Sequence, residues 1–153
     1  MVSPQNPILK NSSKDNRLPF IVFLRVENKQ SKLMRICDVV HKYFSLGERI
    51  LISIMNETSA KFIDALLWQI PPESFLPHLI AEDFCEEPIV ITQSKKNLNK
   101  ASILINLQKD AFANTETFSK IYELKDLTSL EKHDLSCKRE KEYKKMGLQI
   151  IEI

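Results

Sequence analysis

Apolar residues occur along the chain in blocks that have the spacing of either a strand or a helix. Residues 18–26, LPFIVFLRV, form an almost continuous apolar run rich in β-branched and aromatic side chains. Such a run predicts a strand that is buried on both faces of a sheet. Over residues 29–44 the apolar positions recur every three or four residues, and Gly47 follows where a helix would end. This spacing predicts the first helix.

The alternation of strand and helix patterns continues in the next part of the chain. Residues 49–55, RILISIM, predict a second strand, and Asn56 is a suitable cap for a helix whose apolar stripe continues to Ile70. Pro71 and Pro72 end this helix, because proline has no amide hydrogen and restricts the residue before it. Strands that alternate with helices predict a parallel sheet.

The remaining patterns complete an α/β chain. Further strands are predicted at residues 88–92, 102–107 and 118–124, followed by a charged helix over residues 127–146 and a closing strand over residues 148–153. A chain of 153 residues, of which 43% are hydrophobic, can bury one core. We therefore predict a single three-layer α/β domain, with a mostly parallel sheet flanked by helices and a nucleotide-binding-like (Rossmann-like) topology.

The amino-terminal residues differ from the rest of the chain. Residues 1–17 mix proline, asparagine, serine and lysine without periodicity. This composition predicts a flexible arm, which leaves residues 18–153 as the α/β domain. No stretch approaches the about 18 consecutive apolar residues of a membrane span, and the arm lacks the apolar stretch of a signal peptide. We therefore expect a cytoplasmic protein with no membrane contact.

Charge and glycine content narrow the classes of function. The chain has 22 basic and 20 acidic side chains, so its net charge of +2 does not mark the whole surface as a nucleic-acid binder. Its only glycines are Gly47 and Gly147, which excludes a glycine-rich phosphate loop, and we expect no cofactor. The three histidines and three cysteines show no metal-ligand spacing, so no metal site is predicted.

One segment combines the only tryptophan with a loop bounded by prolines. Residues 63–78, IDALLWQIPPESFLPH, place Trp68 before the paired prolines, and Phe75 and His78 after them. The two large aromatic side chains can plug the core at the end of the helix, or they can form a partner-binding patch on a rigid loop. The residues alone leave both interpretations open. No nucleophile with a recognisable motif accompanies His78, so no catalytic residue is predicted.

The last predicted helix carries a second candidate site. Residues 132–147, KHDLSCKREKEYKKMG, place Lys138, Lys141 and Lys145 on one helical face. Acidic residues interleave with these lysines, so the face can also be an ordinary solvated surface. If it is functional, ammonium groups beside apolar residues suit a peptide with carboxylates and a hydrophobic end better than they suit duplex DNA.

The sequence LLWQIPPESFLPH resembles the signature segment of DNA polymerase III chi subunits, which runs leucine-tryptophan, proline, glutamate-serine-phenylalanine and proline-histidine. The order of the predicted elements, the strand SILINL and the position of Tyr143 four residues before Gly147 are also similar, so the resemblance spans residues 18–150. It implies a bacterial accessory subunit with an α/β fold, no catalytic apparatus and no cofactor. The polymerase activity would then belong to another subunit of the holoenzyme.

The resemblance implies two protein partners, of which the first is the psi subunit of the clamp-loader complex. Its contact surface would comprise Trp68, Pro71, Phe75, Pro77 and His78. A helicase-related protein could occupy the same surface in place of psi.

The second implied partner is the acidic carboxy-terminal tail of single-stranded DNA-binding protein, held by the last helix. The residues expected to contact it are Lys138, Arg139, Lys141, Tyr143 and Lys145. This chain has Cys137 where the family usually has arginine, and Glu140 where it usually has tyrosine. We therefore expect tail binding of reduced strength that falls with added salt.

Two other functions remain as alternatives to this adaptor. Lys95, Lys96 and Lys100, together with the lysines of the last helix, could follow the phosphates of a nucleic acid directly. A degenerate enzyme of a nucleotide-binding fold would need a phosphate loop, a metal cluster or an activated nucleophile. None of these is recognisable in the sequence, so we expect a non-catalytic adaptor whose contact with nucleic acid is mainly indirect.

Overall fold

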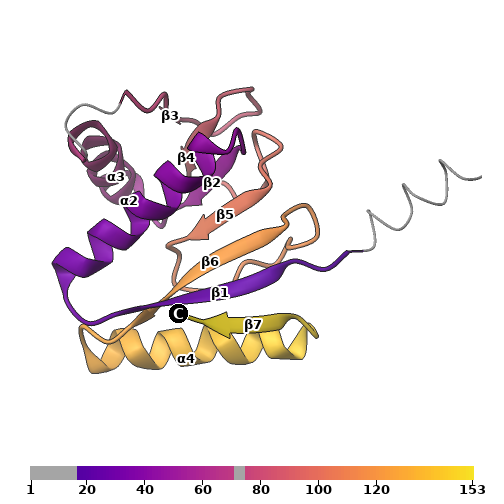
Figure 1. Ribbon diagram of the computed structural model, residues 1–153. Helices are drawn as coiled ribbons and strands as arrows, with labels where there is room; N and C mark the ends of the chain where they lie inside the picture. The colour runs from indigo at the N-terminus through magenta and orange to yellow at the C-terminus, as the bar shows by residue number, and fades with distance from the viewer. Residues whose placement is uncertain (1–16, 71–74) are drawn as a thin grey trace, which may run out of the picture.

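The computed structural model describes residues 17–70 and 75–153, which form a sheet with helices on both of its faces (Figure 1). The predicted arm, apart from Arg17, and Pro71 of the predicted psi contact lie outside the described residues. In chain order the elements are β1 (Phe20–Val26), α2 (Lys29–Ser45), β2 (Ile50–Ser53), α3 (Glu57–Gln69), β3 (Leu79–Ile80), β4 (Ile89–Thr92), β5 (Ile103–Asn106), β6 (Lys120–Asp126), α4 (Leu130–Lys145) and β7 (Gln149–Glu152).

The sheet is parallel throughout the described residues. Its seven strands follow the order β3-β4-β2-β5-β6-β1-β7, and every neighbouring pair runs in the same direction. Helices or long loops connect the strands, as parallel pairing requires. The predicted α/β fold, with three layers, a mostly parallel sheet and a Rossmann-like topology, is confirmed.

Three neighbouring strands inside the sheet are apolar because of their position. β4, β2 and β5 have four residues each, all of them buried. Ile50 of β2 lies between Ile89 of β4 and Ile103 of β5 in the ladder. Because both faces of these strands are covered, their sequences show no alternation of polar and apolar residues. Each strand ends in a buried polar residue at the carboxyl edge of the sheet: Ser53, Thr92 and Asn106.

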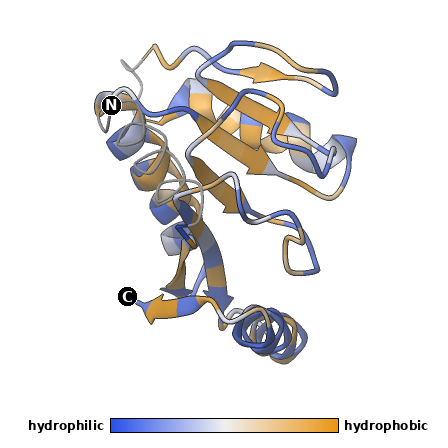
Figure 2. Ribbon diagram, turned by 90° about the vertical axis from the view of Figure 1, so that its right-hand side faces the viewer, coloured by the Kyte–Doolittle hydropathy of each residue, from blue (hydrophilic) through white to orange (hydrophobic). Residues whose placement is uncertain are grey.

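Alternate residues of β1 pack on opposite faces of the sheet. Val22 belongs to the core that includes Val40 of α2, whereas Phe23 packs in a second core with Tyr143 of α4. Helices α2 and α3 therefore cover one face, and α4 covers part of the other. Figure 2 shows the strands mostly in the hydrophobic colour and α4 mostly in the hydrophilic one. Loop residues complete the second core: Leu98, Phe112 and Phe118.

Caps fix the limits of the described helices. Asn28, Asn56 and Ser129 each accept a hydrogen bond from the backbone amide three residues further along. The predicted cap at Asn56 is therefore confirmed. Gly47 and Gly147 follow α2 and α4 with φ angles of 76° and 78°, a left-handed conformation that disfavours side chains with a Cβ atom.

The sequence did not predict β3, a two-residue strand at the edge of the sheet. Leu79 and Ile80 pair with Val90 and Ile91 of β4, and within the described residues no strand lies on their other side. Both of their side chains are exposed. A strand this short carries no periodicity that a sequence pattern could reveal.

Candidate partner-binding surfaces

The edge of the sheet formed by β3 carries several exposed apolar side chains. Trp68, in the last turn of α3, is 54% exposed, and Phe75, in the loop before β3, is 87% exposed. Single exposed apolar residues are common, whereas several large ones at one sheet edge are typical of a binding surface. We call this set the aromatic edge; it comprises Trp68, Phe75, Leu79 and Ile80.

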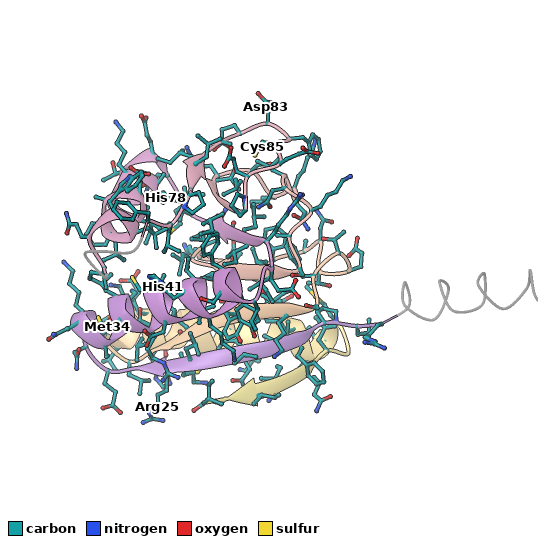
Figure 3. The ribbon with its side chains drawn as sticks, turned by 45° about the horizontal axis from the view of Figure 1, so that its top comes forward. Arg25, Met34, His41, His78, Asp83 and Cys85 are labelled. Atoms are coloured by element: carbon teal, nitrogen blue, oxygen red, sulfur yellow. The ribbon has the colours of Figure 1, made fainter. Side chains whose placement is uncertain are left out.

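The buried side chain of His78 holds the aromatic edge in shape. Its Nδ1 atom lies 2.8 Å from the carbonyl oxygen of Leu76, and its Nε2 atom lies 3.0 Å from a carboxylate oxygen of Asp64. Both oxygens accept hydrogen bonds, so these contacts hold the imidazole ring between α3 and the loop before β3. The centroids of the His78 and Trp68 rings are 4.5 Å apart, and Figure 3 shows His78 beside α3. The buried ring of His78 therefore packs against the exposed side chain of Trp68.

The residues predicted to contact psi separate into two groups. Trp68, Phe75 and Pro77 are exposed, whereas His78 lies beneath them with a fully buried side chain. The exposure of the two aromatic side chains favours the interpretation of a patch over that of a core plug. Leu79 and Ile80 were not expected from the sequence. The apolar residues that follow His78 have neither a helical nor a strand period. That lack of a period was the local sign that they do not belong to the core.

His78→Ala is expected to lower the free energy of unfolding by about 1–3 kcal/mol, because Asp64 and Leu76 lose a buried hydrogen-bond donor. Urea unfolding followed by circular dichroism measures the loss. Phe75→Ala is the control, and it should change the free energy by less than about 0.5 kcal/mol, since its side chain is exposed. Equal losses in both variants would contradict the supporting role of His78.

The solvent face of α4 carries the second candidate surface. Lys138, Lys141 and Lys145 are exposed along it, and we call these three residues the basic row. Lys145 lies 3.5 Å from Glu142, whereas Lys138 and Lys141 form no ion pair with any described residue. The charge of the basic row is therefore only partly neutralised within the protein.

Two lysines form ion pairs with Glu140, which the resemblance places where a tyrosine is usual. The Nζ atoms of Lys125 and Lys144 each lie 3.2 Å from its carboxylate. Burial raises the pKa of Glu140, but the hydrogen bonds and charges of Lys144 and Lys125 outweigh that effect and keep the pKa below its usual value. A carboxylate paired in this way repels an acidic peptide less than a free one would.

Arg139 and Tyr143 do not lie on the exposed face of α4. Arg139 is 8% exposed and Tyr143 is 0% exposed. The Nε atom of Arg139 donates to one carboxylate oxygen of Glu123 at 2.8 Å, and the Tyr143 hydroxyl donates to the other at 2.5 Å. Asn106 also donates to Glu123, and the backbone amide of Phe112 donates to the Tyr143 hydroxyl. These contacts fix α4 to β6, so the structure does not bring the five expected tail-binding residues into one exposed surface.

Glu123 is the buried centre of these contacts and was not expected from the sequence. Burial raises the pKa of its carboxyl group from 4.5 to about 7, against the lowering effects of the Arg139 charge and of the hydrogen bonds from Tyr143 and Asn106. In the sequence, Glu123 is a single acid within the strand KIYELKD. Its role depends on partners in α4 and β5, which no local pattern reveals.

Comparison with known protein families identifies the family to which the chain belongs. The family described as "DNA polymerase III chi subunit, HolC" matches residues 17–151 of this chain. The chain belongs to the DNA polymerase III chi subunit family. The resemblance first drawn from LLWQIPPESFLPH is thereby confirmed, and the aromatic edge and the basic row are surfaces of a chi-family protein.

Chi-family relatives are found in several bacteria. The chain is 31% identical over 117 residues to the DNA polymerase III subunit chi of Haemophilus influenzae, which covers 74% of this chain and 78% of that protein. It is 28% identical over 94 residues to the subunit chi of Pseudomonas aeruginosa, covering 61% and 66% of the two chains. It is 32% identical over 85 residues to the subunit chi of Escherichia coli, covering 54% and 57%. The chain is therefore related to bacterial replication subunits.

The described part of this chi-family chain contains neither a metal-ligand cluster nor a membrane-spanning helix. In residues 17–70 and 75–153, no three histidine, cysteine, aspartate or glutamate side chains are grouped so that they could hold a metal ion. Within the same residues, no helix has both the length and the apolar character that crossing a membrane requires.

Proposed function

We propose that this chi-family protein is a non-catalytic adaptor that links the psi subunit of the clamp loader to the acidic tail of single-stranded DNA-binding protein during DNA replication. The observation that carries the proposal is that the aromatic edge and the basic row lie at different parts of the sheet. The aromatic edge lies at β3, the first strand of the sheet, whereas the basic row lies on α4, which packs against β6 and β7 (Figure 1). Two partners can therefore bind without competing for the same surface.

The aromatic edge suits the psi subunit. Protein interfaces depend on a few large side chains that lose all contact with water on binding, and Trp68 and Phe75 are exposed side chains of this kind. Among the described residues no strand pairs with the outer side of β3, where a partner strand could add to the sheet. A helicase-related protein that used the same two side chains would compete with psi.

The basic row suits the acidic tail. Lys138 and Lys141 have no ion pair with a described residue, and the exposed side chain of Met146 adds apolar surface next to Lys145. Cys137 stands in place of an arginine, so a donor of two parallel hydrogen bonds to a carboxylate is missing. The tail contact of this chain therefore depends mainly on the charge of its lysines.

Lys141→Ala is expected to weaken the binding of the tail peptide about fivefold, because an exposed charge pair contributes up to about 1 kcal/mol. Isothermal calorimetry with the carboxy-terminal peptide of the same organism's single-stranded DNA-binding protein measures the affinity. Binding should also weaken with added salt, which screens exposed charges. Lys61→Ala, an exposed lysine of α3, is the matched control. Salt-independent binding, or equal affinity in both variants, would count against the basic row.

A single-stranded oligonucleotide titrated alone tests direct binding of nucleic acid. Lys95, Lys96 and Lys100 are exposed in the loop between β4 and β5, where a phosphate backbone could reach them. The adaptor proposal expects weak or no binding in this titration. Saturable binding that Lys95→Ala and Lys96→Ala abolish would favour the nucleic-acid-binding alternative.

A further inference from the structure

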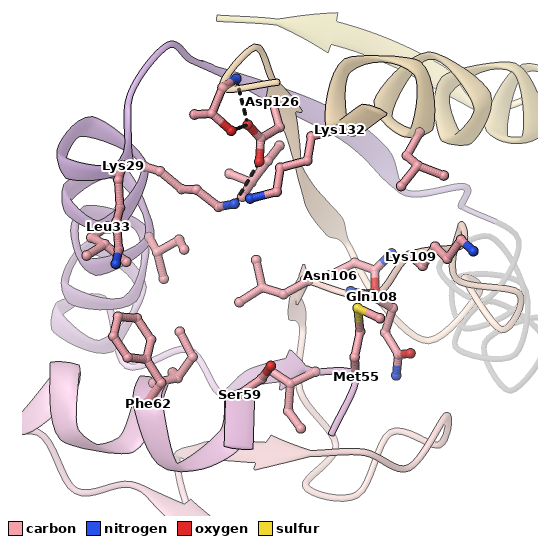
Figure 4. A pocket seen from close by; sticks show the side chains of 18 of the residues that line it. Lys29, Leu33, Met55, Ser59, Phe62, Asn106, Gln108, Lys109, Asp126 and Lys132 are labelled. Carbon is pink, nitrogen blue, oxygen red and sulfur yellow. Dashed lines mark hydrogen bonds and ion pairs between the residues drawn. The ribbon is translucent and has the colours of Figure 1, made fainter. Parts of the chain in front are cut away.

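A cleft of about 990 Å³ opens at the carboxyl edge of the sheet. The first turns of α2, α3 and α4 and the residues that follow β2 and β5 line it (Figure 4). None of its lining residues belongs to the aromatic edge or to the basic row. Open parallel α/β sheets bind their ligands outside the carboxyl ends of the strands, so this is the position where the fold places a ligand site.

Basic side chains outnumber acidic ones in the lining of the cleft. Lys32 pairs with Asp126 at 2.7 Å, and Arg139 pairs with Glu123. Burial raises the pKa of Asp126, but the hydrogen bonds from Lys32 and Thr128 outweigh this effect and hold the pKa below its usual value, so Asp126 stays ionised and fixes Lys32. The basic lining residues are Lys29, Lys32, Lys109, Lys132 and Arg139, and the acidic ones are Asp126 and Glu131.

Three of the basic lining residues, Lys29, Lys109 and Lys132, form no ion pair with a described residue, unlike Lys32 and Arg139. Figure 4 shows the Lys132 side chain extending from α4 into the cleft, where its amino group ends near the dashed ion pair of Asp126. The cleft therefore carries positive charge that the described residues do not neutralise, and an anion would supply the missing counter-charge.

The wall opposite Lys132 is apolar and contains an exposed aromatic ring. Phe62 of α3 is 45% exposed, and the Nζ atom of Lys29 lies 5.8 Å from the centre of its ring. Figure 4 shows Phe62 and Leu33 on the side of the cleft away from Lys132, with Met55 nearer to Gln108. A planar ring can stack on Phe62 while an attached anionic group faces the lysines.

We propose that this cleft binds a nucleoside phosphate, with its phosphates at Lys132 and its base against Phe62. The volume of the cleft falls within the range of about 300–1,000 Å³ that is typical of small-molecule sites. The lack of a glycine-rich loop excludes phosphates wrapped by the backbone, but lysine side chains hold phosphates as point charges. An extended polyanion fits less well, because it would need basic residues that continue beyond the cleft. The proposal does not depend on the adaptor function.

A titration of the full chain with ATP, followed by two-dimensional NMR of its backbone amides, tests the proposal. Saturable shifts are expected at Lys29, Phe62 and Lys132, with weaker binding of AMP than of ATP. Lys132→Ala should weaken ATP binding about tenfold, as expected for one charge-assisted contact to phosphate. Lys138→Ala, on the solvent face of the same helix, is the control and should bind ATP as the parent chain does.

Phe62→Ala separates recognition of the base from recognition of the phosphates. It should weaken the binding of ATP and leave that of inorganic triphosphate unchanged. The proposal is overturned if ATP at millimolar concentration causes no saturable shift, if the shifts lie only on the basic row, or if Lys132→Ala and Lys138→Ala lose equal affinity. Binding of an oligonucleotide without binding of free ATP also overturns it, since the cleft would then belong to a nucleic-acid surface.

Discussion

Arg139→Ala is expected to lower the free energy of unfolding by about 3–5 kcal/mol, the cost of leaving one member of a buried ion pair without its partner. The guanidinium group of Arg139 pairs with Glu123 and also donates to the carbonyl oxygens of Lys109 and Leu124. Alanine removes all of these donors at once. Tyr143 can still donate to Glu123, but it carries no charge that could compensate the buried carboxylate.

The loss in Arg139→Ala should grow with pH. The pKa of Glu123 in the folded protein is about 7, above the ordinary value of 4.5, so the folded state holds this proton more tightly than the unfolded chain does. The stabilisation that comes from the protonated form is complete below about pH 4.5 and is lost as the pH rises through about 7. Without the positive charge of Arg139, ionisation of buried Glu123 costs more free energy. The free energy of unfolding of the variant therefore falls furthest below that of the parent chain at high pH.

Urea unfolding of the parent chain and of Arg139→Ala, at about pH 5 and at about pH 8, measures both effects. Lys138→Ala is the neighbouring control and should change the free energy of unfolding by less than about 0.5 kcal/mol at either pH, because its side chain is exposed. A loss below about 1 kcal/mol in Arg139→Ala, together with loss of tail binding, would contradict this assignment. Arg139 would then act at the tail site.

Local patterns were sufficient to predict most of the fold. The runs RILISIM, PIVIT and SILINL became β2, β4 and β5, because strands buried on both faces need apolar residues at every position. The helix predicted from the spacing over residues 29–44 corresponds to α2, and Asn56 caps α3 as predicted. In these elements the intrinsic preference of each segment agrees with its place in the fold, so the sequence pattern is informative.

The polar helix α4 shows where such patterns fail. Its existence was predicted, but its buried face was not, because that face carries Ser136, Arg139 and Tyr143 in place of an apolar stripe. Their burial depends on Glu123 of β6, whose position opposite α4 is a consequence of the tertiary structure. The local sequence of a polar helix does not show which of its charged residues has a buried partner.

The candidate sites divide in the same way. Trp68 and Phe75 could be chosen from the sequence because an aromatic residue beside prolines is unusual, but their exposure required the structure. The cleft at the carboxyl edge could not be predicted. Its lining residues, such as Phe62 and Lys132, lie far apart in the chain. The order of the strands in the folded sheet brings them together.

Phe75→Ala is expected to weaken the binding of the psi subunit by at least about 30-fold, which corresponds to about 2 kcal/mol for the loss of an aromatic anchor. The Phe75 side chain is 87% exposed, so its burial by a partner removes a large apolar surface from water. Trp68→Ala should have an effect of similar size. Because Trp68 also contacts the buried His78, Phe75 is the cleaner test of binding alone.

Calorimetry with the psi subunit of the same organism measures the effect of Phe75→Ala. Leu130→Ala, an equally exposed apolar residue at the start of α4, is the control and should bind psi as the parent chain does. The affinity of Phe75→Ala for the tail peptide should stay unchanged, because the basic row lies at the other side of the sheet. A loss of both partners in Phe75→Ala would mean that the two contacts are coupled through the fold, since no exposed side chain is shared between them.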